Sequence, residues 1–192
     1  MHSLVKRVIN HGMHNINRIT STLISASLLL MPLRTEAMEI NGTTHFVEVP
    51  TKISLINYSW YAFESGAKIN FVLGLPKGAD AKLGGMNIEQ IRGASPAFYF
   101  GPVKPKSYLG KPRSKGSEIP VSAIFSEDNR NIIIEFKKPI SPGETVTVEF
   151  NIVTNPPMDL YVFSVSAIPW GPNPTSQDVG VVQMNIIEND PY

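Results

Sequence analysis

The sequence predicts an all-β fold, an antiparallel β-sandwich, which follows a short helical export signal. Three observations support this prediction. Apolar and polar residues alternate in several short segments after residue 37, and turn sequences rich in Pro, Gly and Asn separate these segments. No window after residue 37 shows a sustained helical period. The chain has 192 residues and no cysteine, so a single domain has to be held together by its hydrophobic core and not by disulfide bonds.

The first expected element is a secretory signal over residues 1–37. Basic residues precede an apolar run from Ile19 to Leu33, which is shorter than the roughly 20 residues of a membrane-spanning helix. Small residues before position 38 predict cleavage after Ala37. Translation from Met13 in place of Met1 would shorten the signal and leave the same mature chain. The alternatives are an uncleaved anchor and a buried N-terminal helix.

Cleavage leaves residues 38–192 as one β-sandwich domain, exported to the periplasm or the exterior, with the thylakoid lumen as a further alternative. This domain carries 13 basic and 15 acidic residues and one of the four histidines, His45. The charge balance argues against a nucleic-acid partner, and contact with a membrane is expected only through the signal. The lack of cysteine excludes Cys-ligated metal sites, and we expect no metal and no cofactor.

The strands follow in order. The clearest is Thr145–Ile152, where Val146, Val148 and Phe150 alternate with polar residues. The other expected strands cover residues 53–60, 68–75, 119–125, 131–136, 160–168 and 181–187. Residues 86–92 are expected to form a further strand, with a short helix as the alternative. Residues 126–130 are expected to form a hairpin turn, and 141–143 a tight turn. Residues 93–117 are expected to be a loop with one short strand at 97–100. Together these elements predict an immunoglobulin-like sandwich.

Several blocks resemble a known family. The segments Ser65–Phe71, Leu75-Pro76, Ile140–Val148, Asn155-Pro156 and Leu160–Pro169 occur in an order and spacing similar to those of the domain-of-unknown-function family numbered 2808. The resemblance covers roughly residues 50–187. It implies a compact β domain that is exported, in most cases by cyanobacteria, and it implies no known activity or catalytic residue.

A basic segment is the first candidate binding site. Five cations without an intervening acid and one tyrosine lie between positions 104 and 115: Lys104, Lys106, Tyr108, Lys111, Arg113 and Lys115. In a flexible loop these residues could bind an anionic envelope glycan or another anionic surface. A loop kept soluble by its lysines is the simpler interpretation.

An aromatic segment is the second candidate. Interpreted as a strand, Tyr58 and Trp60 share one face while Tyr61 and Phe63 share the other, so that one pair belongs to the core and the other can bind a sugar ring. Trp170, in a Pro-rich loop, is a further candidate for such a surface. Partner identity stays open, because aromatic residues serve cores more often than binding surfaces.

Catalysis is not expected. His45 is the one base available to a serine-type triad, and no Gly-x-Ser-x-Gly motif is present. The adjacent acids Glu127 and Asp128 lie in an expected turn. The sequence therefore predicts a non-catalytic binding or envelope-associated module. The alternatives are a carbohydrate-binding module that uses exposed aromatic residues and a hydrolase that uses a pair of carboxylates.

Overall fold

The computed structural model describes residues 38–40, 42–98 and 104–188, and these residues belong to one compact unit. They form strands, turns and loops, and no helix occurs among them. The part of the chain described here therefore has no helix that could cross a membrane. The proposed signal and its cleavage site at Ala37 lie outside the described residues. The predicted all-β, antiparallel sandwich is confirmed.

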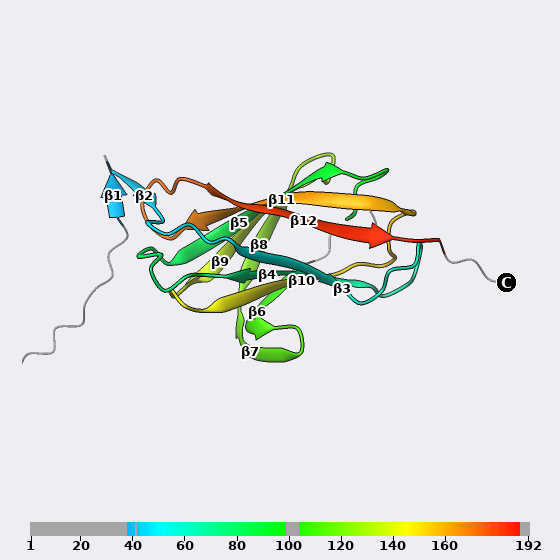
Figure 1. Ribbon diagram of the computed structural model, residues 1–192, viewed down its shortest axis with the longest axis horizontal. Coiled ribbons are helices and arrows are strands. Elements are labelled where there is room, and N and C mark those ends of the chain that lie inside the picture. Colours follow the sequence, from blue (N-terminus) through cyan, green and yellow to red (C-terminus); the bar gives the residue numbers. More distant parts are fainter. Residues whose placement is uncertain (1–37, 41, 99–103, 189–192) are drawn as a thin grey trace, which may run out of the picture. The chain divides into compact units, whose positions relative to one another are not determined.

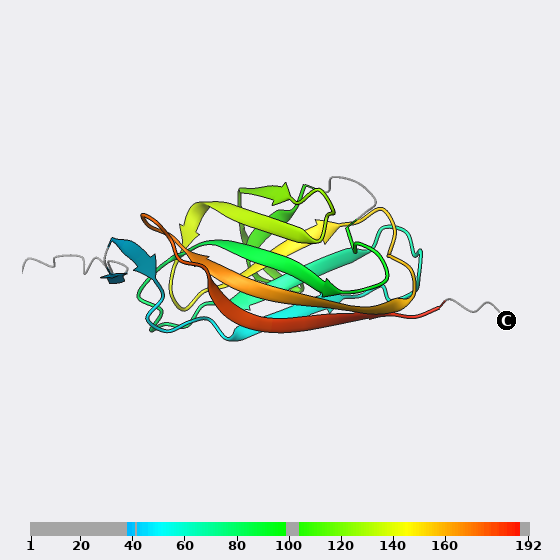
Figure 2. The same ribbon diagram turned by 90° about the horizontal axis from the view of Figure 1, so that it is seen from above.

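Two five-stranded antiparallel sheets make up the sandwich (Figures 1 and 2). The first sheet has the order β3 (Lys52–Asn57), β4 (Lys68–Gly74), β10 (Thr145–Asn151), β6 (Lys106–Lys111), β7 (Ser114–Ile119). The second has the order β12 (Gln177–Ile186), β11 (Asp159–Pro169), β5 (Leu83–Arg92), β9 (Asn131–Ile140), β8 (Val121–Phe125). A separate hairpin consists of β1 (Met38–Ile40) and β2 (Thr43–His45).

The alternating residues of both sheets meet in one core. On β10, Val146, Val148 and Phe150 are buried, as the alternation predicts. Phe71 on β4 makes edge-on ring contacts with Phe150 at 6.0 Å and with Phe163 of the opposite sheet at 5.4 Å. These aromatic contacts join the two sheets at the centre of the domain.

Most predicted strands are confirmed, with small differences at their ends: β4, β5, β9, β10, β11 and β12 occur at the expected segments. Residues 126–130 join β8 and β9 as a hairpin. The strand expected over 119–125 is wrong as a single element. Ile119 ends β7 in the first sheet and Val121 begins β8 in the second. Pro120 lies between them, and a proline without a backbone N–H marks the place where the chain changes sheets.

The loop expected over residues 93–117 is also wrong in part. Strands β6 and β7 occupy much of it and form a hairpin, with Lys111 paired to Ser114. Gly110 has a φ of 89°, a value that glycine adopts without strain, next to an irregularity in the pairing. Of the short strand expected at 97–100, residues 97 and 98 lie in a turn and the other two lie outside the described residues.

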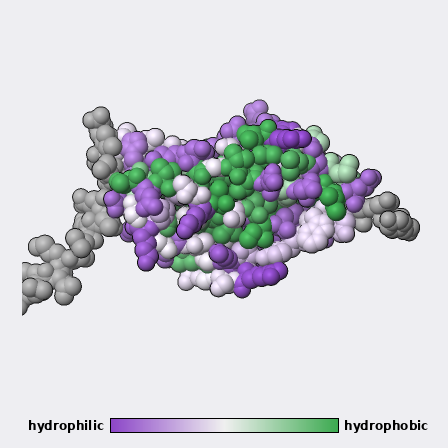
Figure 3. Space-filling view, viewed as in Figure 1, coloured by the Kyte–Doolittle hydropathy of each residue, from purple (hydrophilic) through white to green (hydrophobic). Residues whose placement is uncertain are grey.

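One pair of sheet edges meets where β3 lies beside β12 (Figure 1). Ile53 and Leu55 of β3 are only partly buried at this seam, where they pack against the core. Figure 3 shows a continuous hydrophobic area over the middle of the same face. The core thus approaches the surface between these two edge strands.

The long strand β11 separates the two ends of the domain. Its first residue, Asp159, pairs with Ile186 near the loop that follows β3, while its last residue, Pro169, leads into the loop that contains Trp170 (Figure 1). Because β11 runs along the whole sandwich, residues 58–63 and Trp170 lie at opposite ends. The candidate aromatic residues therefore do not form a single surface.

Candidate functional site: an aromatic end beside a basic hairpin

The aromatic segment leaves the sheet at Asn57 and forms a loop, contrary to the expectation of a strand up to residue 60. The loop pairs with the chain just beyond β12. The Ile187 N–H donates to the Trp60 carbonyl oxygen at 2.8 Å, and the Ala62 N–H donates to the Ile187 carbonyl oxygen at 2.8 Å. The expected division into a core face and an outer face is wrong. Exposed fractions of Tyr58, Trp60, Tyr61 and Phe63 range from 40% to 61%.

Asn155, in the segment between β10 and β11, fixes this loop from below the surface. Its Nδ2 donates to the carbonyl oxygens of Ser59 at 2.8 Å and Tyr61 at 3.0 Å, and its backbone N–H donates to the Glu64 carbonyl oxygen at 2.9 Å. Asn155 is completely buried. One side chain therefore satisfies two carbonyl groups that strand pairing would otherwise have satisfied.

Three segments thus bring exposed apolar side chains to one end of the domain, which we call the aromatic end. Its members are Tyr58, Trp60, Tyr61, Phe63, Val153, Met158 and Ile187, each at least 40% exposed. Phe63 has a φ of 59°, a left-handed conformation that is costly for a bulky residue. The loop therefore holds a phenyl ring in solvent at an energetic cost.

The rings of the aromatic end do not form a flat platform. The Trp60 and Tyr61 centroids are 6.5 Å apart and their planes are inclined by 57°. Aliphatic and thioether side chains fill out the rest of the surface. Such a surface fits an irregular apolar counterpart better than the flat face of a sugar ring.

The basic hairpin, β6 with β7, adjoins the aromatic end. The Arg113 guanidinium carbon, in the turn of the hairpin, lies 5.2 Å from the centre of the Tyr58 ring, within the range of a cation–π contact. Two segments predicted as separate candidates therefore meet in space. Lys104, Lys106 and Lys111 are exposed nearby in the chain, and each remains free to face solvent.

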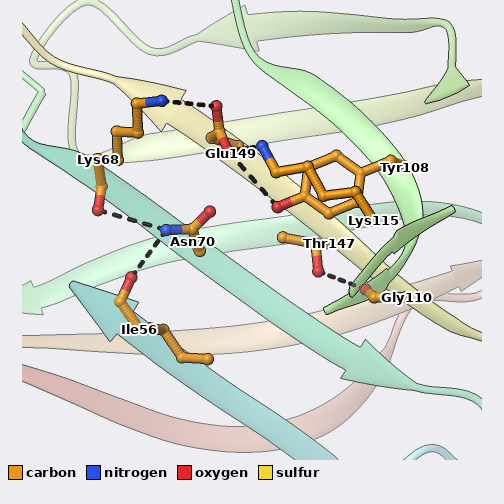
Figure 4. A network of polar contacts seen from close by, with 8 residues as sticks. All are labelled: Ile56, Lys68, Asn70, Tyr108, Gly110, Lys115, Thr147 and Glu149. Atoms are coloured by element: carbon orange, nitrogen blue, oxygen red, sulfur yellow. Dashed lines mark hydrogen bonds and ion pairs between the residues drawn. The ribbon is translucent and has the colours of Figure 1, made fainter. Parts of the chain in front are cut away.

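Two residues of the basic candidate segment, Tyr108 and Lys115, make contacts inside the domain (Figure 4). Lys115 Nζ lies 2.7 Å from Glu149 Oε2 and 4.5 Å from the centre of the Tyr108 ring. Lys68 Nζ lies 3.7 Å from the other carboxylate oxygen of Glu149. Tyr108 is buried and its hydroxyl donates to Glu149 at 3.5 Å. These contacts attach the hairpin to the outer face of β10.

The contacts in this network favour the charged forms of Glu149 and Lys115. Burial acts to raise the pKa of Glu149, but the hydrogen bond and charge of Lys115, with the charge of Lys68, outweigh it and lower the pKa. The hydrogen bond to Glu149 likewise raises the pKa of Lys115. Burial raises the pKa of Tyr108, which therefore stays neutral. A cavity of about 200 Å³ borders the network, lined in part by Lys106 and Glu118.

The remaining acidic and histidine candidates have ordinary surroundings. Asp128 accepts hydrogen bonds from the Ser126 hydroxyl at 2.6 Å and the Arg130 N–H at 3.0 Å, which lower its pKa and close the β8–β9 turn. His45 Nε2 lies 2.7 Å from the Thr43 hydroxyl. Among the residues with described positions, no group of three His, Asp or Glu side chains is arranged to hold a metal ion.

The sequence profile of one family, described as "Protein of unknown function (DUF2808)", matches residues 43–186. The chain belongs to the DUF2808 family. The resemblance inferred from Ser65–Phe71 and the later blocks is thus confirmed. None of the curated proteins matches this DUF2808 member in sequence.

Solved structures provide distant similarities. BslA, a bacterial hydrophobin, has a TM-score of 0.44 and 10% identity, covering 75% of this chain and 99% of BslA. The collagen-binding subdomain ACE19 of an Enterococcus faecalis surface protein has a TM-score of 0.40 and 7% identity, covering 72% and 98%. MyfA, the major subunit of Myf fimbriae from Yersinia enterocolitica, has a TM-score of 0.36 and 12% identity, covering 71% and 98%.

Several residues of the site were missed in the sequence. In the sequence Asn155 stands out only as part of an Asn-Pro pair, although asparagine side chains often form hydrogen bonds with backbone groups in turns. The alternation in β10 puts Glu149 on the outer face of the strand, where a charged side chain is expected and indicates no special role. Val153, Met158 and Ile187 join the aromatic end only through the tertiary pairing of three distant segments.

Proposed function

We propose that this DUF2808 protein is an exported, non-catalytic binding module of the cell envelope that docks a protein partner with its aromatic end. The observation that carries the proposal is the exposure of all four aromatic side chains in residues 58–63. Monomeric domains rarely keep a contiguous apolar surface of this kind unless it serves a contact.

The composition of the aromatic end supports a protein partner. Tyr, Trp, Phe, Met and Arg are enriched in the cores of protein–protein interfaces, and Trp, Tyr and Arg dominate their binding energy. Trp60, Phe63, Met158 and Arg113 supply these types within one surface. The acids Glu64 and Glu188 are close in the chain to this surface, and with Arg113 they suit the polar rim of a protein interface.

Export is the part of the proposal that depends on the N-terminal residues. The apolar run at 19–33, the preceding cations and the small residues before position 38 are typical of a secretory signal. Periplasm, exterior and thylakoid lumen are all compatible with this signal. N-terminal sequencing of the exported protein is expected to begin at Met38; an intact Met1 or Met13 in a membrane fraction would contradict cleavage.

A non-catalytic role is supported by the surroundings of the titratable groups. Glu149 is compensated by Lys115 and Lys68, and Asp128 serves a turn. Neither arrangement provides the pair of carboxylates, one protonated and one ionised, that glycoside hydrolysis needs.

Site-specific photo-crosslinking tests the docking surface. A photoreactive amino acid replaces Met158 in the full-length protein, expressed in its own host, and the crosslinked partner is identified and purified. Trp60→Ala is then expected to weaken binding to that partner by about 30-fold or more, as for a central aromatic contact.

The matched control uses apolar side chains that are about as exposed as Trp60 but lie on the second sheet. Ile124→Ala and Val181→Ala, at 57% and 59% exposure, are expected to leave the affinity unchanged. Equal crosslinking from position 124, or full affinity in Trp60→Ala, would contradict docking through the aromatic end. Crosslinks to lipid or glycan alone would do the same.

A further inference from the structure

A second surface lies at the opposite end of the domain, above the outer face of the second sheet. It is a cavity of about 540 Å³, and its lining includes Gly84, Glu135, Lys137, Ile168 and Trp170. The volume falls in the range of sites that bind small molecules. We propose that this cavity binds a neutral saccharide.

Two glycines of β5, Gly84 and Gly85, lie at this part of the sheet, and Gly84 lines the cavity. Gly85 on β5 pairs with Glu135 of β9 on one side and with Ile168 of β11 on the other. No side chain therefore fills the centre of this row. A methyl group at Gly84 would come within 3.1 Å of the Pro169 carbonyl oxygen and of the Trp170 Cα, so glycine also lets the Trp170 loop approach the sheet closely.

The Trp170 side chain supplies an aromatic wall. It is 46% exposed, and its backbone N–H is fixed by donating to the Lys82 carbonyl oxygen at 2.7 Å. An indole face that remains in solvent next to a cavity offers an apolar surface for the C–H groups of a sugar ring. Unlike the inclined rings of Trp60 and Tyr61, this single ring faces no neighbouring aromatic ring within the described contacts.

Polar groups line the other side. Lys137 Nζ lies 3.7 Å from Glu135 Oε2, and the Ser122 hydroxyl donates to the same oxygen at 3.2 Å. Both charged side chains are more than half exposed, so they can turn toward a ligand. Because their charges compensate each other, the site suits hydroxyl groups, which both donate and accept hydrogen bonds, better than it suits a charged ligand.

The loop that carries Trp170 is held rigid by β2. The buried Thr44 donates through its hydroxyl to the Pro172 carbonyl oxygen at 2.7 Å, and its carbonyl oxygen accepts from the Thr175 N–H at 3.0 Å. The Asn173 side chain donates to Gly42 at 3.1 Å. A wall that is fixed before the ligand arrives loses little conformational entropy on binding. The small hairpin β1–β2 thus supports the cavity.

Tryptophan fluorescence tests the proposal directly, because the chain has two tryptophans and they lie at opposite ends. In the full-length Trp60→Phe variant, Trp170 is the one remaining reporter. We titrate it with tetrasaccharides of β1,4-linked glucose, α1,4-linked glucose and β1,4-linked N-acetylglucosamine, and with an acidic tetrasaccharide of galacturonate.

At least one neutral tetrasaccharide is expected to change Trp170 fluorescence saturably, and to bind more tightly than the acidic one. Calorimetry with the same sugar is expected to show at least a tenfold loss of affinity in Trp170→Ala and a smaller loss in Glu135→Ala. Trp60→Phe should bind like the original protein. Thermal unfolding of each variant confirms that the loss is not one of folding.

Failure of all three neutral sugars, or full affinity in Trp170→Ala, would overturn the proposal. So would binding of an apolar naphthalene dye in the absence of any sugar binding, since it would mark a purely hydrophobic site. These outcomes are independent of the protein-docking function, because that function is measured through Trp60 and Met158 at the other end.

Discussion

Lys115 Nζ lies 2.7 Å from Glu149 Oε2, so a half-exposed cation neutralises a carboxylate that is only 6% exposed. This pair connects the edge strand β7 to β10 across the intervening β6. The two partners differ in their exposure to solvent. When the pair is broken, the lysine can be rehydrated, while the carboxylate remains largely shielded from water.

Replacing Lys115 is therefore expected to destabilise the domain. Lys115→Ala leaves Glu149 with the more distant Lys68 and should lower the free energy of unfolding by about 1–3 kcal/mol. The matched control is Lys137→Ala, which breaks an exposed pair and should cost at most about 1 kcal/mol. Urea unfolding of both variants measures the difference, and equal effects would show that the Glu149 pair is no stronger than a surface pair.

Stability is expected to fall in acid through the same carboxylate. The folded-state pKa of Glu149 lies below its ordinary value of 4.5. Its stabilising contribution is complete above the unfolded-state pKa and is lost as the pH falls through the folded-state pKa. Asp128, whose pKa is also lowered, adds to the acid dependence. Urea midpoints measured from pH 7 down to pH 3 should therefore fall less steeply in Glu149→Gln than in the original protein; parallel curves would contradict this.

Asn155 is expected to hold the aromatic end in place. Asn155→Ala removes both donors to the Ser59 and Tyr61 carbonyl oxygens and should cost about 1–3 kcal/mol. Hydrogen exchange should become faster at the amides of residues 60–64, and stay unchanged in β5 at the centre of the other sheet. Unchanged exchange at Ala62 would mean that Ile187 alone fixes the loop.

The left-handed conformation of the exposed Phe63 is expected to lower the stability of the domain. Asparagine adopts positive φ more easily than phenylalanine, so Phe63→Asn should raise the free energy of unfolding by about 0.5–1 kcal/mol. The same change should weaken binding of the crosslinked partner. A matched Phe125→Asn change, at a partly buried position of β8, should destabilise. Loss of stability in Phe63→Asn would show that the phenyl ring packs within the domain.

Gly171 is expected to be essential for the contact between the Trp170 loop and β2. An added methyl group would overlap the Thr44 hydroxyl and lie 2.9 Å from its Cγ2, so Gly171→Ala should cost about 1–3 kcal/mol. Gly74→Ala is the control, since its methyl group would meet Lys52 Cβ at an ordinary 3.4 Å. Thermal unfolding compares the two, and similar midpoints would show that the loop can shift away from Thr44.

The strands were predictable where alternation is strong. In β10, Val146, Val148 and Phe150 point to the same face, and a slip of one residue in the pairing register would move all three out of the core. The hairpin β6–β7 lacks this signal, because its segment Lys106–Ile119 is rich in Lys, Gly and Ser and its outer strand is exposed. Its pairing depends on contacts with β10, including the Thr147 hydroxyl bond to the Gly110 carbonyl oxygen at 2.6 Å.

The candidate residues were predictable by type but not by arrangement. Exposed aromatic residues at 58–63 and cations at 104–115 stand out in the sequence. Their proximity, shown by Arg113 over Tyr58, follows from a sheet order that joins segments far apart in the chain. The sequence does not separate Trp170 from the other aromatic residues, because periodicity gives no information on which end of a sandwich a loop occupies.

The attachment of β2 to the far end of the chain has a consequence for the order of folding. The Phe46 N–H donates to the Gln177 side chain across 131 positions of sequence, and the Gln177 side-chain amide donates back to the Phe46 carbonyl oxygen. Such contacts can form only after nearly the whole domain has been synthesised, and closing so long a loop slows folding. The domain can therefore complete its structure only after the start of β12 is available to pair with the segment that follows β2.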